Sequence, residues 1–201
     1  MMPLDNEPLT SETALSWVRW CTRDYWQYAD ESWHQYDFFQ LASSRQQMIA
    51  RLLPSAVQRN LQVNELLPEP PMPLAIGISA LSPAKRLDML ILVSEICFPG
   101  SYDHQLLTEP QIWCRRIARA LFSDNKYPVK QLAEQSLAEG LIMLRALYPD
   151  CWSRLRLLFP RSLTLEVDNQ MVIEAPSGKL LSLWHAVIWQ CQQPGKLRHV
   201  D

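Results

Sequence analysis

Apolar side chains recur at helical spacing along most of the chain, most clearly within residues 131–160. The members of this stripe repeat every three or four residues: Ala133, Leu137, Leu141, Leu144 and Tyr148. Such spacing predicts an amphipathic helix whose apolar side faces a core. Gly140 lies inside this helix, where glycine costs about 1 kcal/mol relative to alanine, and we expect it to admit a neighbouring helix at close range. After a break at Pro149, Trp152 is expected to be a buried anchor.

The same pattern predicts further helices before and after this stretch. The first is capped by Thr10 or Ser11, and the others cover 41–53, 54–61, 83–97, 109–122 and 180–191. Ser82 and Pro83 suit a helix start, because serine accepts the N-cap hydrogen bond and proline tolerates the first turn. Residues 89–93 are apolar on every side, so the helix 83–97 is expected to be buried. Residues 74–81 are interpreted as an apolar lead-in to it.

The period changes in the last fifth of the chain. Residues 163–167 alternate apolar and polar side chains, Asp168 and Asn169 form a turn signal, and a second short run covers 171–174. This pattern predicts a small β-hairpin. The fold class is therefore predicted to be mainly α, a single helical domain with a small C-terminal β-hairpin. The polar tail after Gln192 is expected to fray.

The length of 201 residues suits one domain with a full core. Residues 1–10 are polar and are expected to be disordered, so the helical domain is predicted to cover 11–201. Within it we distinguish an aromatic N-terminal subregion (11–66) and a main body (74–192). The connector between them, 67–73, contains four prolines, which favour an extended and semi-rigid segment.

Charge is spread unevenly. Residues 1–40 carry seven acidic side chains against two arginines, whereas the remainder carries 17 basic and 14 acidic side chains. An acidic arm on a mildly basic body indicates either docking or a solvated acidic surface. The net charge of −2 offers no basic excess for nucleic acid. The longest apolar run, 89–93, is too short to cross a bilayer, and the first residues lack a signal-peptide pattern. A cytoplasmic protein without membrane insertion is expected.

Cysteine usage argues against a disulfide framework or a zinc site, because the count is odd and no CxxC occurs. The five cysteines are Cys21, Cys97, Cys114, Cys151 and Cys191. Three of them have apolar neighbours and are predicted to be small buried side chains: Cys97, Cys114 and Cys191.

Motifs for chemistry are also missing from the sequence. The four histidines are scattered without metal-ligand spacing: His34, His104, His185 and His199. No GxSxG, GxGxxG or GxxxxGK[ST] occurs. We therefore assign no catalytic residue, no cofactor and no metal ligand, and we predict that the protein is not an enzyme.

Arginines and tryptophans supply the candidate partner-binding residues. Arg154, Arg156 and Arg161 flank apolar side chains, and guanidinium groups beside apolar anchors suit carboxylate recognition. The aromatic subregion adds three further candidates: Trp20, Trp26 and Trp33. The alternatives stay open: the arginine stems lie on the core with their charges in solvent, and the aromatic rings pack onto the body. If the arginines bind a partner, charge reversal at Arg154 and Arg156 should weaken binding without lowering the melting temperature.

A family resemblance enters at two neighbouring stretches. Residues 140–149 read Gly-Leu-Ile-Met-Leu-Arg-Ala-Leu-Tyr-Pro, and residues 152–160 read Trp-Ser-Arg-Leu-Arg-Leu-Leu-Phe-Pro. Together they resemble the C-terminal part of the type III secretion sorting-platform adaptor family (SctK/YscK). Residues 78–90 are similar to that family's leucine-rich helix, and 180–190 to its closing helix. The resemblance covers about 75–190. The N-terminal third departs from it, because the family's early aromatic-Cys-Pro pattern lacks its proline here.

The resemblance implies a non-enzymatic cytosolic adaptor without a cofactor. Its partners would be the cytoplasmic domain of the inner-membrane ring protein and the pod protein of the injectisome, reached through protein contacts at the inner-membrane face. Two other classes of function remain as alternatives. An apolar peptide groove would favour a cytosolic helical chaperone for a redox enzyme or a secreted protein. A deep pocket with convergent polar groups would favour an enzyme.

Overall fold

Helix α6 (Pro83–Cys97) is the buried centre of the fold. Its start is as predicted: the Ser82 hydroxyl accepts a hydrogen bond from the Lys85 main-chain N–H (3.4 Å), and Pro83 occupies the first turn. Ten of its fifteen residues are buried, as the all-round apolar pattern of 89–93 predicts. Helices α7 (Thr108–Leu121), α8 (Ala138–Leu147) and α11 (Ser177–Gln192) pack around it.

The described part of the chain is mainly helical. In this computed structural model the described residues are 11–68, 72–102, 104–122, 136–171 and 177–199. Before α6 come α1 (Ser11–Arg19), a π-helix (Trp20–Asp24), a 3₁₀ turn (Glu31–Trp33), α2 (Asp37–Gln40), α3 (Ser43–Leu52), α4 (Pro54–Asn60) and α5 (Pro73–Ala80). Between α8 and α11 come a 3₁₀ turn (Pro149–Cys151), α9 (Trp152–Leu155), a 3₁₀ turn (Arg156–Leu158) and α10 (Arg161–Asp168).

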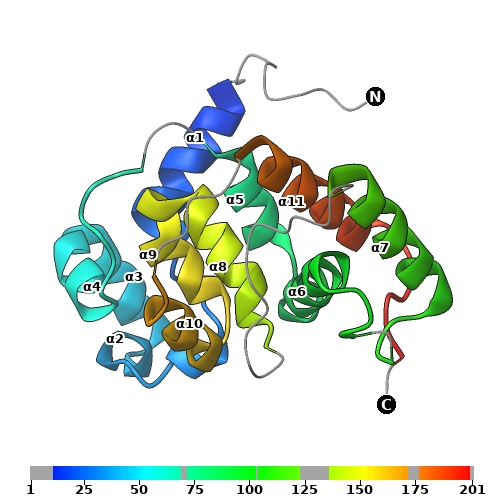
Figure 1. Ribbon diagram of the computed structural model, residues 1–201. Coiled ribbons are helices and arrows are strands. Elements are labelled where there is room, and N and C mark those ends of the chain that lie inside the picture. The colour runs from blue at the N-terminus through cyan, green and yellow to red at the C-terminus, as the bar shows by residue number, and fades with distance from the viewer. Residues whose placement is uncertain (1–10, 69–71, 103, 123–135, 172–176, 200–201) are drawn as a thin grey trace.

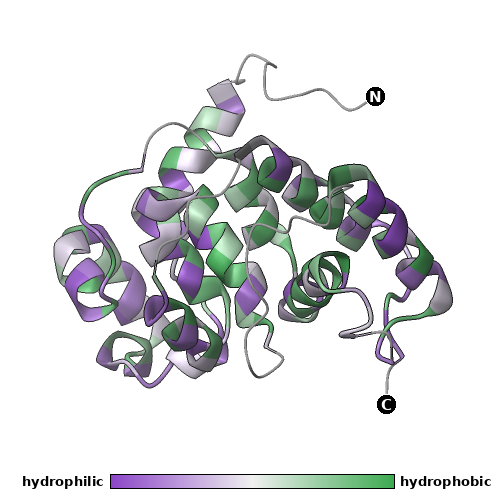
Figure 2. Cartoon of the chain, in the orientation of Figure 1, coloured by the Kyte–Doolittle hydropathy of each residue, from purple (hydrophilic) through white to green (hydrophobic). Residues whose placement is uncertain are grey.

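The helices form an elongated molecule (Figure 1). Helices α2, α3 and α4 form one end of the molecule, α8, α9 and α10 lie in the middle, and α7 forms the other end. Hydrophobic residues follow α6 and α8 in the interior, whereas hydrophilic residues mark the outward side of α7 (Figure 2). Buried apolar side chains from α1 to α11 belong to one continuous cluster. The predicted mainly α fold is thus confirmed.

Gly140 brings α8 close to α6. A Cβ atom at this position would lie 3.4 Å from both Leu90 Cδ2 and Val93 Cγ1 of α6. The close approach expected from the sequence is confirmed. A methyl group fits between the two helices at ordinary contact distance, but a larger side chain does not.

Substitutions at Gly140 test this close approach. We expect Gly140→Ala to leave stability unchanged or to raise it by up to about 1 kcal/mol, because alanine favours the helix and its methyl group fits. Gly140→Leu should lower stability by about 1–3 kcal/mol through overpacking against α6. Chemical denaturation of both variants measures the difference. Equal stability of the two variants would show that the helices are not in close contact here.

The predicted β-hairpin is wrong, because its first strand is helix α10. Within the described residues the chain forms no β-strand. The alternation at 163–167 conceals a helical period: the side chains that α10 buries are Thr164 and Val167, three residues apart, and they face α8. Packing on α8 therefore decides the structure of this stretch. Of the second predicted strand, 172–174 lie outside the described residues.

Two further expectations need correction. Residues 74–81, interpreted as a lead-in, and Pro73, the last residue of the predicted extended connector, lie in or next to helix α5 (Pro73–Ala80), which buries Leu74, Ala75 and Ile78 at helical spacing. The C-terminal tail is held rather than frayed. Its Leu197 carbonyl accepts a hydrogen bond from the Leu107 N–H (3.0 Å), and Arg198 forms an ion pair with Asp88 of α6. The predicted disordered residues 1–10 and the connector positions 69–71 lie outside the described residues.

Candidate functional site

Arg154 on α9 is a fully buried cation held by main-chain carbonyl groups. It is 0% exposed. Its Nε donates to the Cys21 carbonyl (3.0 Å), and its two terminal nitrogens donate to the carbonyls of Leu66 (3.1 Å) and Asn64 (2.9 Å). The planar guanidinium offers donors in several directions, so one side chain joins two separate N-terminal segments to α9. It also lies over the Tyr25 ring, 5.8 Å from the centroid.

Arg156, two residues later, repeats this arrangement at the end of α4. One terminal nitrogen donates to the carbonyls of Leu61 (3.3 Å) and Gln62 (3.0 Å). Gln62 has a positive φ of 53°, so the chain turns sharply here. The other terminal nitrogen forms an ion pair with the Asp168 carboxylate (3.0 Å) at the end of α10. Arg156 therefore holds α4 and α10 against the same 3₁₀ turn.

Aromatic rings of the N-terminal subregion continue the contact with this segment. The Arg156 guanidinium lies 5.3 Å from the Trp33 ring, and the Arg161 guanidinium lies 6.0 Å from the Tyr36 ring. The Trp33 indole N–H also donates to the Phe159 carbonyl (2.8 Å). Successive arginines of residues 154–161 are thus matched with successive aromatic rings of residues 25–36, which docks the aromatic subregion on the body.

The predicted partner-binding residues mostly face the interior. Those with at most 9% exposure are Arg154, Arg156, Trp20, Trp26 and Trp33, whereas Arg161 is half-buried. The expectation that these guanidinium and indole groups form an outward surface is therefore corrected. Their physical role is internal, since desolvated cations need hydrogen-bond acceptors and large aromatic side chains gain stability from burial.

Arg86 on α6 is a buried arginine that sequence reasoning missed. Its terminal nitrogens donate to the carbonyls of Tyr28 (2.9 Å), Leu158 (3.1 Å) and Ser79 (3.0 Å). Burial lowers the pKa of its guanidinium, and the Asp30 carboxylate opposes that effect. The available signal was the basic pair Lys85 and Arg86 in a helix that is expected to be buried, because a buried cation needs hydrogen-bond acceptors.

Arg145 on α8 caps α10, a role that the sequence pattern did not indicate. Its terminal nitrogens donate to the carbonyls of Val167 and Gln170 (2.7 Å to the latter). The last carbonyl groups of a helix have no partner within the helix and carry partial negative charge. Arg145 supplies both donors and charge, which explains why a basic residue lies on the buried side of α8.

Glu95 near the end of α6 is a buried acid with a similar structural role. One carboxylate oxygen accepts from the Gly100 N–H (2.8 Å), and the other accepts from the Tyr102 N–H (2.9 Å). Glu95 is 1% exposed, so these main-chain donors replace the water that its charge would otherwise need. The side chain fixes the loop between α6 and α7.

All five cysteines are free and buried, which confirms the prediction for Cys97, Cys114 and Cys191. Burial raises the pKa of the Cys21, Cys97 and Cys191 thiols to about 12. For Cys97 the nearby Glu139 carboxylate adds to that effect. The thiolate is the reactive form of cysteine, so these side chains are small core residues in the folded chain.

The raised thiol pKa values predict how stability changes with pH. A thiol ionises at lower pH in the unfolded chain than in the folded chain, so the folded chain binds these protons more tightly. Their contribution is therefore complete below an unfolded pKa of about 8.5 and is lost as the pH rises toward 12. We expect the free energy of unfolding to be lower at about pH 10 than at about pH 7.5. The difference between the two pH values should be smaller in a Cys97→Ala variant. Urea denaturation at both pH values measures this. An unchanged free energy of unfolding would contradict it.

In the described part of the chain, no group of three or more His, Cys, Asp or Glu side chains is placed to hold a metal ion. Likewise, none of the helices in the described ranges is long and apolar enough to span a membrane.

The α3 face is the first exposed surface that combines apolar and basic side chains. We define it by Arg45, Met48, Arg51, Leu52 and Leu53. Met48, Leu52 and Leu53 are 52%, 67% and 59% exposed, and α3 has no buried residue. Large aliphatic side chains gathered on the surface mark interaction sites more often than scattered ones do.

The α7–α11 face has the same chemistry and lies at the other end of the molecule (Figure 1). We define it by Ile112, Arg116 and Arg119 on the outward side of α7, together with Trp189 on the neighbouring helix α11. Ile112 and Trp189 are 42% and 45% exposed, and both arginines are exposed. Ile112 lies four residues before Arg116 and seven before Arg119, so the three share one side of α7.

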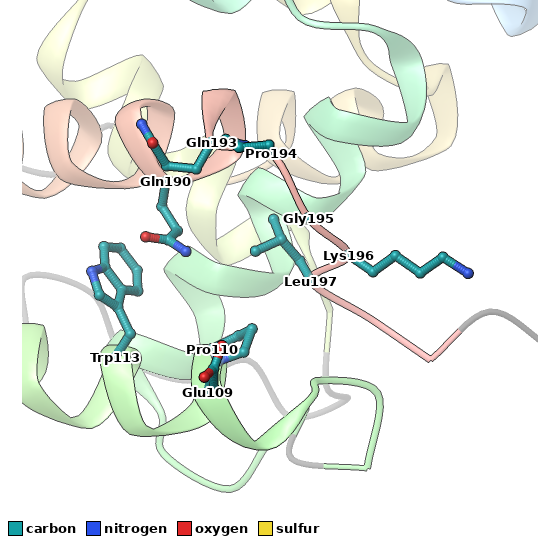
Figure 3. Close-up of a pocket in the computed structure, with 9 residues that line it drawn as sticks. All are labelled: Glu109, Pro110, Trp113, Gln190, Gln193, Pro194, Gly195, Lys196 and Leu197. Atoms are coloured by element: carbon teal, nitrogen blue, oxygen red, sulfur yellow. The ribbon is translucent and has the colours of Figure 1, made fainter.

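A hollow of about 260 Å³ lies between α7, α11 and the C-terminal tail. Trp113, Pro110, Gln190 and Leu197 gather around it, whereas the Lys196 ammonium points away (Figure 3). A second hollow, of about 290 Å³, lies beside the start of α6 and residues 158–160. Both are slightly smaller than the range of about 300–1,000 Å³ that is typical of small-molecule sites.

No protein-family model, curated protein or solved structure matches this chain. The resemblance to the type III secretion adaptor family therefore stays a prediction from the residues of 75–190.

Proposed function

We propose that this protein is a non-enzymatic adaptor that binds two protein partners at its two ends. The observation that carries the proposal is the pair of exposed faces with matching chemistry, the α3 face and the α7–α11 face, separated by the length of the molecule (Figure 1). Each combines large apolar side chains with arginines, the residue types that anchor protein interfaces.

The interior between the two ends suits this role. Arg86, Arg154 and Arg156 tie the N-terminal segments to α6 and α9 through buried hydrogen bonds. Such a network specifies one arrangement of the helices, because a displaced guanidinium would be left buried without acceptors. A rigid body between two binding faces holds its partners at a fixed distance.

Within this class we propose the type III secretion injectisome as the setting. Residues 75–190 resemble the sorting-platform adaptor family, whose members link the inner-membrane ring to the cytoplasmic pods. The partners would then be the cytoplasmic domain of the ring protein and the pod protein, and the place of action would be the cytoplasmic side of the inner membrane.

Affinity purification of the tagged full-length chain from its native bacterium tests this proposal. Recovery of both ring and pod components is the expected result. Recovery of an apo-redox enzyme or an unfolded secreted protein would instead establish the chaperone alternative. Recovery of a single partner under crosslinking conditions would contradict an adaptor that binds at both ends.

A further inference from the structure

The α3 face has a regular pattern of anchors and charges. Met48 and Leu52 are four residues apart and so lie one above the other on the helix. Arg45 precedes Met48 by three residues, and Arg51 follows it by three. Because each turn has 3.6 residues, the two guanidinium groups lie on opposite sides of the apolar pair. The result is an aliphatic ridge with a cation along each edge.

The charges on α3 and α4 have one sign, whereas exposed acids lie just outside them at Asp37 of α2 and at Glu65. Residues 38–64 contain Arg45, Arg51 and Arg59 and not one acidic side chain. Within the described part of the chain, Arg45 and Arg51 make neither an ion pair nor a side-chain hydrogen bond. They differ in this from Arg154 and its neighbours, which use their donors internally. The α3 face therefore has apolar side chains and cations that the fold itself does not use.

The remaining sides of α3 are committed to the fold. Ile49 and Ala50 are the partly buried side chains that pack toward the core, and α4 packs against α3 as its neighbour. Met48 and Leu52 project away from this contact, since both side chains are more than half exposed. A partner can approach without any rearrangement of α3.

We infer that the α3 face binds an acidic amphipathic helix of a partner protein. A helix with leucines at i, i+3, i+4 and i+7 places an apolar stripe against Met48 and Leu52. Glutamates flanking that stripe then reach Arg45 and Arg51, where guanidinium–carboxylate contacts give orientation and specificity. This inference rests on the proposed adaptor function and names the partner chemistry at one of its two ends.

A protein helix fits this face better than an anionic membrane does. Each basic residue near an anionic bilayer contributes about 1 kcal/mol, so Arg45 and Arg51 alone would bind it weakly. The three aliphatic side chains of the face include no aromatic ring of the kind that interfacial helices insert among lipid headgroups. One cation on each side of an apolar pair complements an acidic amphipathic helix in charge and in the position of its apolar stripe.

A binding titration with a synthetic helix tests the inference. The probe is a fluorescein-labelled peptide with leucines at i, i+3, i+4 and i+7 and glutamates beside them, titrated with the full-length protein by anisotropy. We expect saturable binding that weakens with salt. The variant Arg45→Glu with Arg51→Glu should lose at least about tenfold in affinity, and so should Met48→Ser with Leu52→Ser.

The control variant, Arg19→Glu with Arg23→Glu, makes the same change in net charge at exposed positions on α1 and the π-helix and should bind as the wild type does. A control peptide with glutamines in place of glutamates should bind at least about tenfold more weakly. The melting temperatures of all variants should agree, because the altered side chains are exposed.

Several results would overturn the inference: equal binding by the α3 charge-reversal variant, equal binding of the glutamine peptide, or no peptide binding together with binding to vesicles of phosphatidylserine and phosphatidylcholine. A dimer formed through the α3 face, detected by light scattering, would overturn the inference too. The adaptor proposal fails separately. If the peptide binds as expected but native purification returns neither ring nor pod protein, the α3 site stands and the injectisome setting falls.

Discussion

Replacing Arg154 with alanine is expected to lower the free energy of unfolding by about 3–5 kcal/mol. The guanidinium is 0% exposed and donates to three main-chain carbonyl groups. Without it, the carbonyl of the buried Cys21 loses its side-chain donor, and a buried unsatisfied group costs about 1–3 kcal/mol. The exposed segment at Asn64 and Leu66 also loses its hydrogen bonds to α9. Chemical denaturation of wild type and variant measures the loss.

Two control variants separate the Arg154 network from a general charge effect. Arg119→Ala removes an exposed arginine on α7 and should change stability by no more than about 0.5 kcal/mol. Arg154→Lys keeps the charge but not the planar set of donors, so it should remain strongly destabilised. If Arg154→Ala costs no more than Arg119→Ala, the buried network does not hold the N-terminal segments.

Trp152→Ala is the second substitution with a large expected effect, about 3–5 kcal/mol. Trp152 opens α9, is 7% exposed, and donates from its indole N–H to the Asp168 carboxylate (2.7 Å). That carboxylate also pairs with Arg156. The substitution therefore leaves a cavity and removes one donor from an acid that ties α9 to α10.

Trp152→Phe separates the two contributions of Trp152. It keeps most of the ring and removes the indole donor, so we expect a loss of about 1–3 kcal/mol. Thermal and urea denaturation should rank wild type above Trp152→Phe and Trp152→Phe above Trp152→Ala. Equal stability of Trp152→Phe and Trp152→Ala would mean that ring burial contributes little here.

The sequence predicts the helices well where apolar spacing and caps agree. Helix α6 begins at Pro83 after the Ser82 cap, as expected, and Gly140 marks the contact between α6 and α8. Trp152 is the buried anchor that was predicted. These features depend on local pattern, which a single chain carries in full.

The errors arise where tertiary contacts decide the outcome. Residues 163–167 alternate like a strand, yet they form part of α10 because Thr164 and Val167 pack on α8. The C-terminal tail is held by distant partners near 105–107. Neither contact leaves a local signal, since the partners are separated by many residues.

The buried arginines also could not be predicted, because the groups that they contact leave no local signal in the sequence. Arg154 and Arg156 stand beside apolar residues in the sequence, and this pattern fits a partner surface as well as a buried network. Their acceptors are main-chain carbonyls at Cys21, Leu61 and Asn64, which no residue type reveals. The exposed faces on α3 and α7 could be recognised only once the burial of each side chain was known.

The central claim is that the two ends of the molecule bind different partners. Its most direct test is recovery of native partners with two charge-reversal variants of the full-length chain. One is Arg45→Glu with Arg51→Glu on the α3 face, and the other is Arg116→Glu with Arg119→Glu on the α7–α11 face. Both change exposed side chains and should melt like the wild type. We predict that each variant loses one partner and keeps the other, and that the two variants lose different partners. Loss of the same partner by both variants, or full recovery by both, would contradict the account.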